Sequence, residues 1–137
     1  TMALNGALGG LVAITAEPLA PSPMLAIFIG AVGGLIVVLS IPMLDKFKVD
    51  DVVGAIPVHL FAGIWGTMIV PATNADASYV TQFISIVVVG VFVCVTAGIA
   101  WSILKSAVGI RVGEEEEISG LDTSELGMEA YPEFSKG

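Results

Sequence analysis

The sequence holds few of the residues that metal sites, disulfides and nucleic-acid surfaces require. It has one cysteine and one histidine, too few for an intrachain disulfide or for a zinc site built from Cys and His. Five Lys and Arg residues stand against thirteen Asp and Glu residues, which leaves no basic surface for a phosphate backbone. We therefore expect no metal, no cofactor and no nucleic-acid partner.

Charge of either sign is also scarce. Only 13% of the residues are charged, against roughly 25% in soluble domains, and the mean hydropathy is +0.94. The acids are concentrated near the end, since residues 113–137 carry a net charge of −7 and residues 1–112 only −1. The sequence thus predicts an apolar body, residues 1–109, followed by an acidic tail, residues 110–137.

The body contains long runs without any charged residue. Three of them have 27, 24 and 28 residues, and a bilayer-spanning helix needs about 20 apolar residues. A fourth run at the start is shorter and rich in Ala, Leu and Gly. These runs predict an all-α polytopic membrane protein with four transmembrane helices at about 1–16, 23–44, 52–71 and 80–109.

The first span is short, and the sequence begins with Thr1 and without the charged segment that opens a signal peptide. We interpret the chain as a fragment of a longer protein. The alternative is a natural four-helix membrane protein with an unusually short first span.

The few bases predict the orientation. The loop at 45–51 holds two lysines, and Lys105 and Arg111 mark the end of the last span, two crossings later. The loops around Glu17 and Asp76, on the opposite side, contain no Lys or Arg. By the positive-inside rule, the 45–51 loop and the tail are cytoplasmic.

Glycines recur at helical spacing within the apolar runs. In a bilayer, where no hydrophobic force drives helices together, small residues allow the close backbone approach that stabilises helix pairs. Tight helix packing is therefore the expected role of the pairs Gly6 and Gly10, Gly30 and Gly34, and Gly63 and Gly66.

Apart from Lys105 at the end of the last span, His59 is the one acidic or basic residue within the three long spans. A polar ring at this depth is costly, and such residues usually face a bundle interior or a water-filled path. The helical period predicts that His59 shares one face with small residues, namely Ala55, Ala62, Gly63 and Gly66. We favour a conduction path beside His59; the alternative is a packing histidine bonded to a neighbouring carbonyl.

Two features before His59 bear on its helix. Pro57 cannot donate a backbone hydrogen bond, so a kink is expected, together with a free carbonyl at Val53. Asp50 and Asp51 precede the span, where carboxylates accept free backbone N–H groups. We expect these two aspartates to be structural helix caps. Within the spans we find no nucleophile–base pair or carboxylate dyad, so we expect no enzyme.

Several strings together resemble the ammonium transporter family (Amt/Mep/Rh). They are NGALGGLVAIT from Asn5, the VDD at 49–51, GAIPVHLFAGIWG from Gly54, and the tail run from Gly109 to Tyr131 that contains VGEEEEISGLD and ends in AY. Their order and spacing agree over essentially the whole chain.

The resemblance implies the C-terminal four of eleven spans, with one pore in each subunit of a homotrimer in the plasma (cell inner) membrane. It implies ammonium, ammonia or methylammonium as substrate. His59 matches the second of two histidines that meet across a narrow, mainly apolar pore, and Ala55 is its expected pore-facing neighbour. The first histidine belongs to a half that is absent here.

The resemblance also implies a regulatory cytoplasmic tail. The residues that match its pattern are Arg111, Gly120, Leu121, Asp122 and Tyr131, and Ser124 falls where plant members carry a phosphorylated Thr. A PII-type signal protein is an implied partner. A solvated, disordered acidic tail is the alternative, and an ammonium sensor that signals through the tail is the alternative function.

Overall fold

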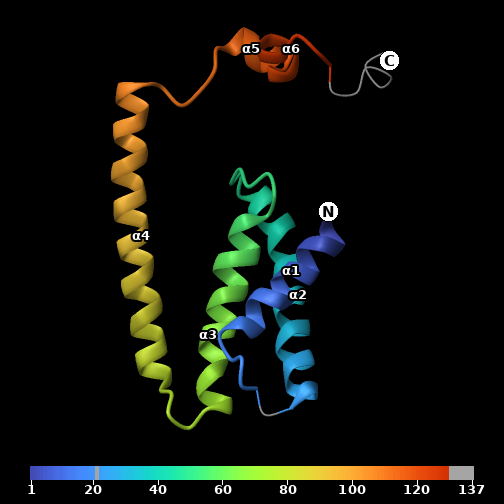
Figure 1. The fold of residues 1–137 in the computed structure, drawn as a ribbon, viewed down its shortest axis with the longest axis vertical. Helices are drawn as coiled ribbons and strands as arrows, with labels where there is room; N and C mark the ends of the chain where they lie inside the picture. Colours follow the sequence, from blue (N-terminus) through green and yellow to red (C-terminus); the bar gives the residue numbers. More distant parts are fainter. Residues whose placement is uncertain (21, 130–137) are drawn as a thin grey trace. The chain divides into compact units, whose positions relative to one another are not determined.

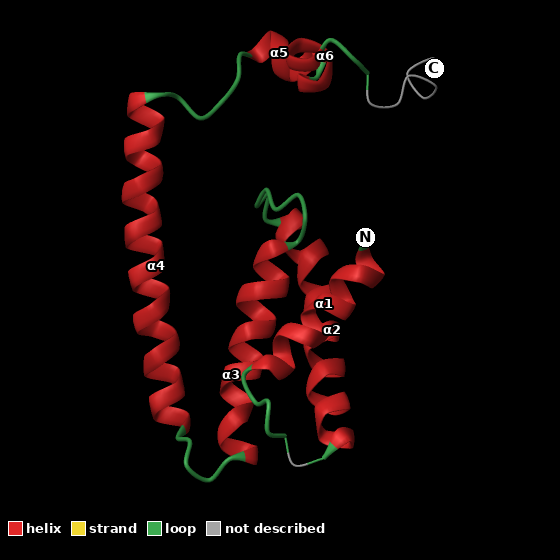
Figure 2. Cartoon of the chain, viewed as in Figure 1, coloured by secondary structure: helices red, strands yellow, loops and turns green. Residues whose placement is uncertain are grey.

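The computed structural model describes residues 1–20 and 22–129, and every regular element in them is helical (Figure 2). The predicted all-α class is confirmed. The elements are α1 (Met2–Thr15), α2 (Pro23–Lys46), the π-helix η1 (Ile56–Phe61), α3 (Ala62–Thr73), α4 (Tyr79–Ala107), α5 (Glu114–Ser119) and α6 (Leu121–Leu126).

Three helical stretches are long and apolar enough to cross a membrane. They are α2, the continuous stretch of η1 and α3 at Ile56–Thr73, and α4, whereas α1 is a shorter apolar helix. The helix of the predicted span 52–71 begins only at Ile56, because the Gly54 N–H first bonds to the Asp51 carbonyl in a turn. The last stretch ends at Ala107, since Gly109 adopts a positive φ of 82° and its N–H bonds back to the Leu104 carbonyl.

Residues 1–92 form one compact unit, in which α1, α2, η1 and α3 pack together (Figure 1). α2 begins with a local cap, since the Ser22 hydroxyl accepts a hydrogen bond from the Leu25 N–H and Pro23 occupies the first turn. At its other end, Lys48 takes a left-handed conformation with φ 57°, and the Val49 N–H bonds to the Leu44 carbonyl. This turn redirects the chain toward η1.

Glycines bring α1 and α2 into backbone contact, as their spacing predicts. A Cβ added to Gly10 would lie 3.0 Å from the Gly30 carbonyl oxygen, and one added to Gly34 would lie 2.8 Å from the Gly6 carbonyl oxygen. On α3, a Cβ at Gly66 would collide with the Ala13 backbone. The prediction of tight packing is confirmed for these residues, whereas Gly63 has more room, its nearest neighbour being 3.9 Å away.

A small apolar core lies where η1 and α3 meet the first two helices. Val37, Val58 and Ala62 are buried there, and Val12 and Ile41 pack against them. The Trp65 indole N–H donates to the Ile29 carbonyl over 3.0 Å and joins α3 to α2. The side of the η1–α3 helix that carries Val58 and Ala62 therefore packs inside the bundle.

The second compact unit comprises residues 93–137, so the division falls within α4. None of the 29 described residues of α4 is buried. The helix is apolar on all sides, which is typical of a segment that faces lipid or other membrane helices. After α4, the short helices α5 and α6 contact each other.

Candidate functional site

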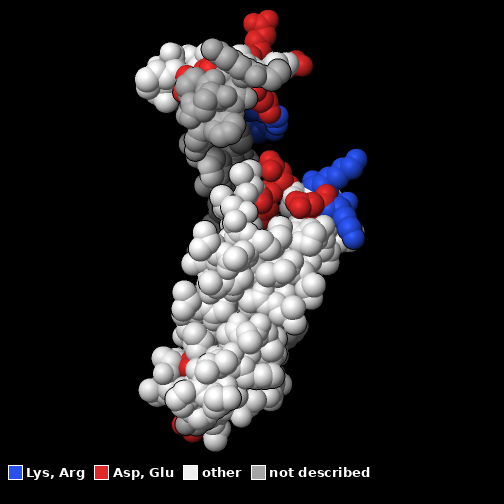
Figure 3. Space-filling model, turned by 90° about the vertical axis from the view of Figure 1, so that its right-hand side faces the viewer, with Lys and Arg blue, Asp and Glu red and all other residues white. Residues whose placement is uncertain are grey.

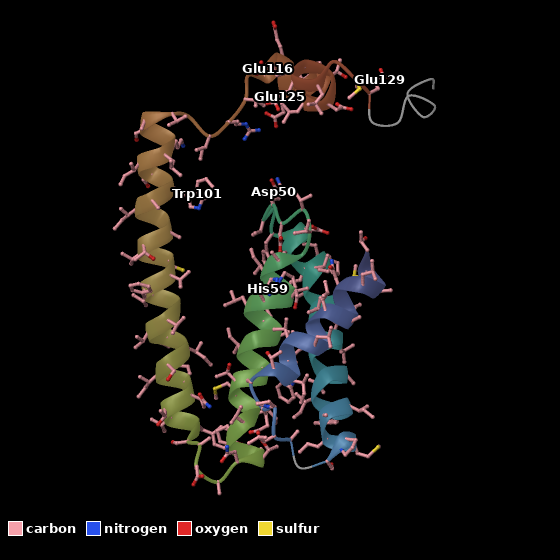
Figure 4. All side chains as sticks on the ribbon, in the orientation of Figure 1. Asp50, His59, Trp101, Glu116, Glu125 and Glu129 are labelled. Carbon is pink, nitrogen blue, oxygen red and sulfur yellow. The ribbon has the colours of Figure 1, made fainter. Side chains whose placement is uncertain are left out.

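The helix that carries His59 begins at a carboxylate cap. Asp51 Oδ1 accepts a hydrogen bond from the Ala55 N–H and Asp51 Oδ2 accepts one from the Ile56 N–H, both over 2.8 Å. A single carboxylate thus satisfies two N–H groups that have no partner within the helix and places negative charge at its positive dipole end. Asp50 lies in the loop just before it (Figure 4), and both cap bonds go to Asp51.

Proline sets the pattern of backbone hydrogen bonds after this cap. Because Pro57 has no N–H, the Val53 carbonyl lacks its helical donor, as the sequence predicts. The side-chain amide of Asn5, on α1, fills the place by donating to the Val53 carbonyl over 3.0 Å. The helix thus leaves the Val53 carbonyl without a donor, as expected, and a residue 48 positions away in the sequence supplies one.

The expected kink takes the form of a π-helix. Residues 56–61 form its wide turn, and the Ala62 N–H bonds to the Pro57 carbonyl five residues back. Pro57 lies in the first turn of this helix, the place where a missing N–H is best tolerated. Such single π turns occur frequently at functional sites, and this one contains His59.

His59 and Ala55 both lie on the exposed side of this helix, whereas Ala62 and Gly66 are buried against the bundle. The prediction that His59 shares one face with Ala55, Ala62, Gly63 and Gly66 is therefore wrong for Ala62 and Gly66, and Gly63 is only partly exposed. The π turn inserts one residue, which displaces the later positions by about 100°, one residue's share of a 3.6-residue turn. The sequence count assumed an unbroken α-helix.

The imidazole of His59 makes no hydrogen bond within residues 1–20 and 22–129, and His59 is exposed whereas Pro57 and Val58 before it are buried. Figure 4 labels it on the helix formed by η1 and α3. This arrangement leaves a donor and an acceptor on a neutral ring available to a ligand or to another side chain.

An open cavity of about 710 Å³ lies at the same end of the bundle. It is lined by the start of α1 and by the loop that joins α2 to η1, and Asn5, Asp51 and Gly54 are among its lining residues. The interactions that start the His59 helix therefore border a space that solvent reaches.

The opposite end of the bundle holds a buried carboxylate that the sequence analysis treated only as part of a loop. Glu17 is 4% exposed, and its Oε2 accepts a hydrogen bond from the Thr73 hydroxyl over 3.1 Å. This contact joins the end of α1 to the end of α3. An acid directly after an apolar helix and before Pro18 was the available signal, but nothing local indicates Thr73 as its partner.

Charges gather at the ends of this bundle. Figure 3 shows blue and red side chains clustered at one end of the bundle, a few red atoms near the other end, and a white flank between them. The loop at 45–51 supplies two lysines and three aspartates there. In the part of the chain that the structure describes, no group of His, Cys, Asp and Glu side chains has the arrangement of a metal site.

The tail contains ordered local contacts. Arg111 forms a two-pronged ion pair with the Glu117 carboxylate, with N–O distances of 2.6 to 3.1 Å, and Glu116 Oε2 accepts from the Gly113 N–H. Gly120, at φ 92°, separates α5 from α6, and its carbonyl accepts from the Ser124 hydroxyl.

The other predicted tail residues have simple placements. Leu121 begins α6 and Asp122 follows it in the first turn, both within the second compact unit. Tyr131 lies outside the described residues.

Comparison with known proteins gives a consistent result. The sequence model described as "Ammonium Transporter Family" matches residues 1–131. The chain is 39% identical to ammonium transporter Amt2 of Archaeoglobus fulgidus over 97% of its own length and 33% of that protein's. It is 35% identical to ammonium transporter Amt1 of Haloferax mediterranei, over 95% of the chain and 26% of the relative.

A bacterial relative gives the same picture. The ammonium transporter of Bacillus subtilis is 32% identical, over 94% of this chain and 36% of its own length. The chain thus spans about a third of the length of the relatives it matches. The apolar helices of spanning length, taken with these relatives, identify a multi-pass membrane protein. The chain belongs to the ammonium transporter family, whose members named here are transporters and not enzymes.

Proposed function

We propose that this chain is the C-terminal part of an ammonium channel or transporter, supplying spans eight to eleven of an eleven-span fold and the tail that follows them. The match over residues 1–131 and the greater length of the relatives support this assignment. The presence of three helices of spanning length and a shorter fourth agrees with it.

His59 lines the conduction path in this proposal, with Ala55 as its neighbour on the same side. The observation that carries the role is an exposed imidazole on an apolar helix, at a π turn, on the side not packed in the bundle. Ammonium pays a large desolvation penalty in an apolar path, so transfer of its proton allows neutral ammonia to pass. Imidazole both donates and accepts hydrogen bonds, and a second histidine outside this chain would complete the pair.

The remaining elements of the proposal concern assembly and location. The protein would form a homotrimer in the plasma membrane, with methylammonium as a further substrate. The lysines of the 45–51 loop support a cytoplasmic position for that loop and for the tail. A PII-type signal protein would bind from the cytoplasmic side.

The tail is proposed as a regulatory segment. Its local hydrogen bonds support this role, because Arg111 binds Glu117 of α5, and Gly120, between α5 and α6, accepts from the Ser124 hydroxyl. Leu121, Asp122 and Tyr131 belong to the same proposed segment. A phosphate on Ser124 would add charge to an already acidic stretch and weaken its docking.

Substitution of His59 in the full-length protein tests the pore role. We expect His59→Ala to change the rate of methylammonium uptake while the purified protein keeps its oligomeric state. Leu60→Ala, at a neighbouring exposed position of the same π-helix, is the matched control. Uptake that is unaltered by His59→Ala would contradict the proposal, and so would an equal change in both variants.

An ammonium sensor that signals through the tail is the second candidate, favoured by the ordered contacts of α5 and α6. Deletion of residues 113–137 separates the two functions. A sensor would lose signalling with transport intact, whereas a regulated transporter would show lost or unregulated uptake.

A further inference from the structure

The position of His59 is determined by its backbone. In the described part of the chain its imidazole has no hydrogen-bond partner, and its neighbours Pro57 and Val58 are buried while it is exposed. A side chain without partners of its own points where its helix directs it. Whatever fixes the rotation of η1 about its axis therefore fixes His59.

Besides the core packing of Val58, three sets of hydrogen bonds hold the start of η1, and one of these sets comes from another helix. Asp51 caps the Ala55 and Ile56 N–H groups, and the Gly54 carbonyl accepts from the Val58 N–H over 3.1 Å. Both are local. The third is the bond from the Asn5 side chain on α1 to the Val53 carbonyl.

Close packing at Gly54 reinforces this third interaction. Gly54 has a positive φ of 78°, and a Cβ there would lie 2.9 Å from Asn5 Nδ2 and 3.2 Å from the Ile41 methyl carbon of α2. The turn before η1 is thus held between α1 and α2 at one residue. Asn5 is the polar contact in this arrangement, and it takes the acceptor that Pro57 leaves unpaired.

We propose that Asn5 is a positioning residue for His59: by holding the Val53 carbonyl, it fixes the rotation of the π-helix and so aims the imidazole at the conduction path. This inference rests on the proposed pore role of His59. Asn5 itself touches no substrate in the proposal and acts only through the backbone from Val53 to His59.

The alternative role for Asn5 is a purely structural link between helices. The Trp65 bond to the Ile29 carbonyl is such a link, because it has the same 3.0 Å length, also joins two helices of the bundle, and lies beyond the π-helix. Loss of either bond should weaken the bundle. Only loss of the Asn5 bond should change what His59 does.

The test uses the full-length transporter and methylammonium uptake, normalised to correctly assembled protein. We expect Asn5→Leu, which keeps the branched shape but removes the donor, to lower the maximal rate about tenfold, since misplacement of a functional group by about 1 Å has effects of this order or larger. Asn5→Gln keeps an amide donor and should recover most of the rate. Trp65→Phe should leave the maximal rate per assembled protein close to that of the parent.

A double substitution identifies the route of the effect. If Asn5 acts through His59, Asn5→Leu should have no further effect in the His59→Ala background, so the two changes are not additive. Additive effects, or equal rates for Asn5→Leu and Trp65→Phe, would overturn the positioning role and leave the pore role of His59 intact. An unaltered rate in His59→Ala would instead overturn the proposed function.

If the Asn5→Leu protein does not assemble, a second variant, Asn5→Ser, takes its place in the test. Asn5→Ser keeps a small polar side chain whose hydroxyl is too short to reach the Val53 carbonyl, and it should show the same loss of rate. A normal rate for an assembled Asn5→Ser variant would equally overturn the inference.

Discussion

Two helices of the same bundle begin with a proline in the first turn, but they differ in their caps and in the turn that follows. α2 has a local Ser22 cap before Pro23 and continues as a regular α-helix of 24 residues. The helix that begins at Ile56 is capped from Asp51, five residues back, and Pro57 is followed by a π turn. A local cap matches the α-helical repeat, whereas a cap from further back is compatible with a wider first turn.

The two helix starts also differ in their polar contacts, because only the start of the π-helix receives a side-chain hydrogen bond from another helix among those described above. The regular helix α2 has its glycines on the face toward α1, and its start has no partner in another helix among the hydrogen bonds described above. The π-helix draws on Asn5 of α1 and exposes His59. The wide turn allows one side of the helix to pack while a polar side chain stays outside the packing.

The largest effect is expected from filling the contact that holds α3 against α1. Gly66→Ala places a Cβ against the Ala13 backbone, which cannot move aside as a side chain does. We expect a loss of about 3 kcal/mol in the free energy of unfolding. Gly63→Ala is the control, because its nearest neighbour is 3.9 Å away, and it should be nearly neutral in the same denaturation experiment in detergent.

Removal of the two caps compares the helix starts directly. Asp51→Ala leaves two N–H groups without an ionised acceptor, and we expect it to cost about 2 kcal/mol. Ser22→Ala removes one neutral bond and should cost about 1 kcal/mol. Unfolding midpoints of the two variants in one detergent show which loses more stability. An equal loss, or a larger loss for Ser22→Ala, would contradict the prediction that the Asp51 cap contributes more.

The prolines can be exchanged for alanine to test the origin of the π turn. Pro57→Ala supplies an N–H that competes with Asn5 for the Val53 carbonyl, so we expect the turn to become α-helical and the orientation of His59 to change. Pro23→Ala should change stability by only a few tenths of a kcal/mol, because the first turn needs no N–H there. A structure of the Pro57→Ala protein that retains the wide turn would show that the proline does not cause it.

The smallest effect concerns the loop between the two helices. Lys48 has a positive φ of 57°, a conformation that glycine adopts without steric strain. Lys48→Gly should therefore raise the free energy of unfolding by about 0.5 to 1 kcal/mol. Gly54→Ala, at φ 78° and in contact with Asn5 and Ile41, should do the reverse. Thermal unfolding of both variants in detergent checks the opposite signs.

The local parts of the site were accessible from the sequence. Pro57 predicted a carbonyl without a donor at Val53, and the glycine spacing predicted the close approach of α1 and α2; both depend on rules that act within a few residues or along one helix face. The partner of the carbonyl was not accessible, since Asn5 lies 48 residues away. The link between Glu17 and Thr73 was missed for the same reason, because it spans 56 residues.

The sequence by itself determined the helical class and the approximate position of the apolar spans, because hydropathy and backbone hydrogen-bonding rules within a bilayer leave few other structures. Only the tertiary structure decided which side of the helix formed by η1 and α3 faces outward. A single inserted residue at η1 rotates Ala62 and Gly66 into the bundle and leaves His59 exposed. That rotation also depends on contacts from other helices, such as the bond from Asn5 to the Val53 carbonyl, which no pattern within the helix contains.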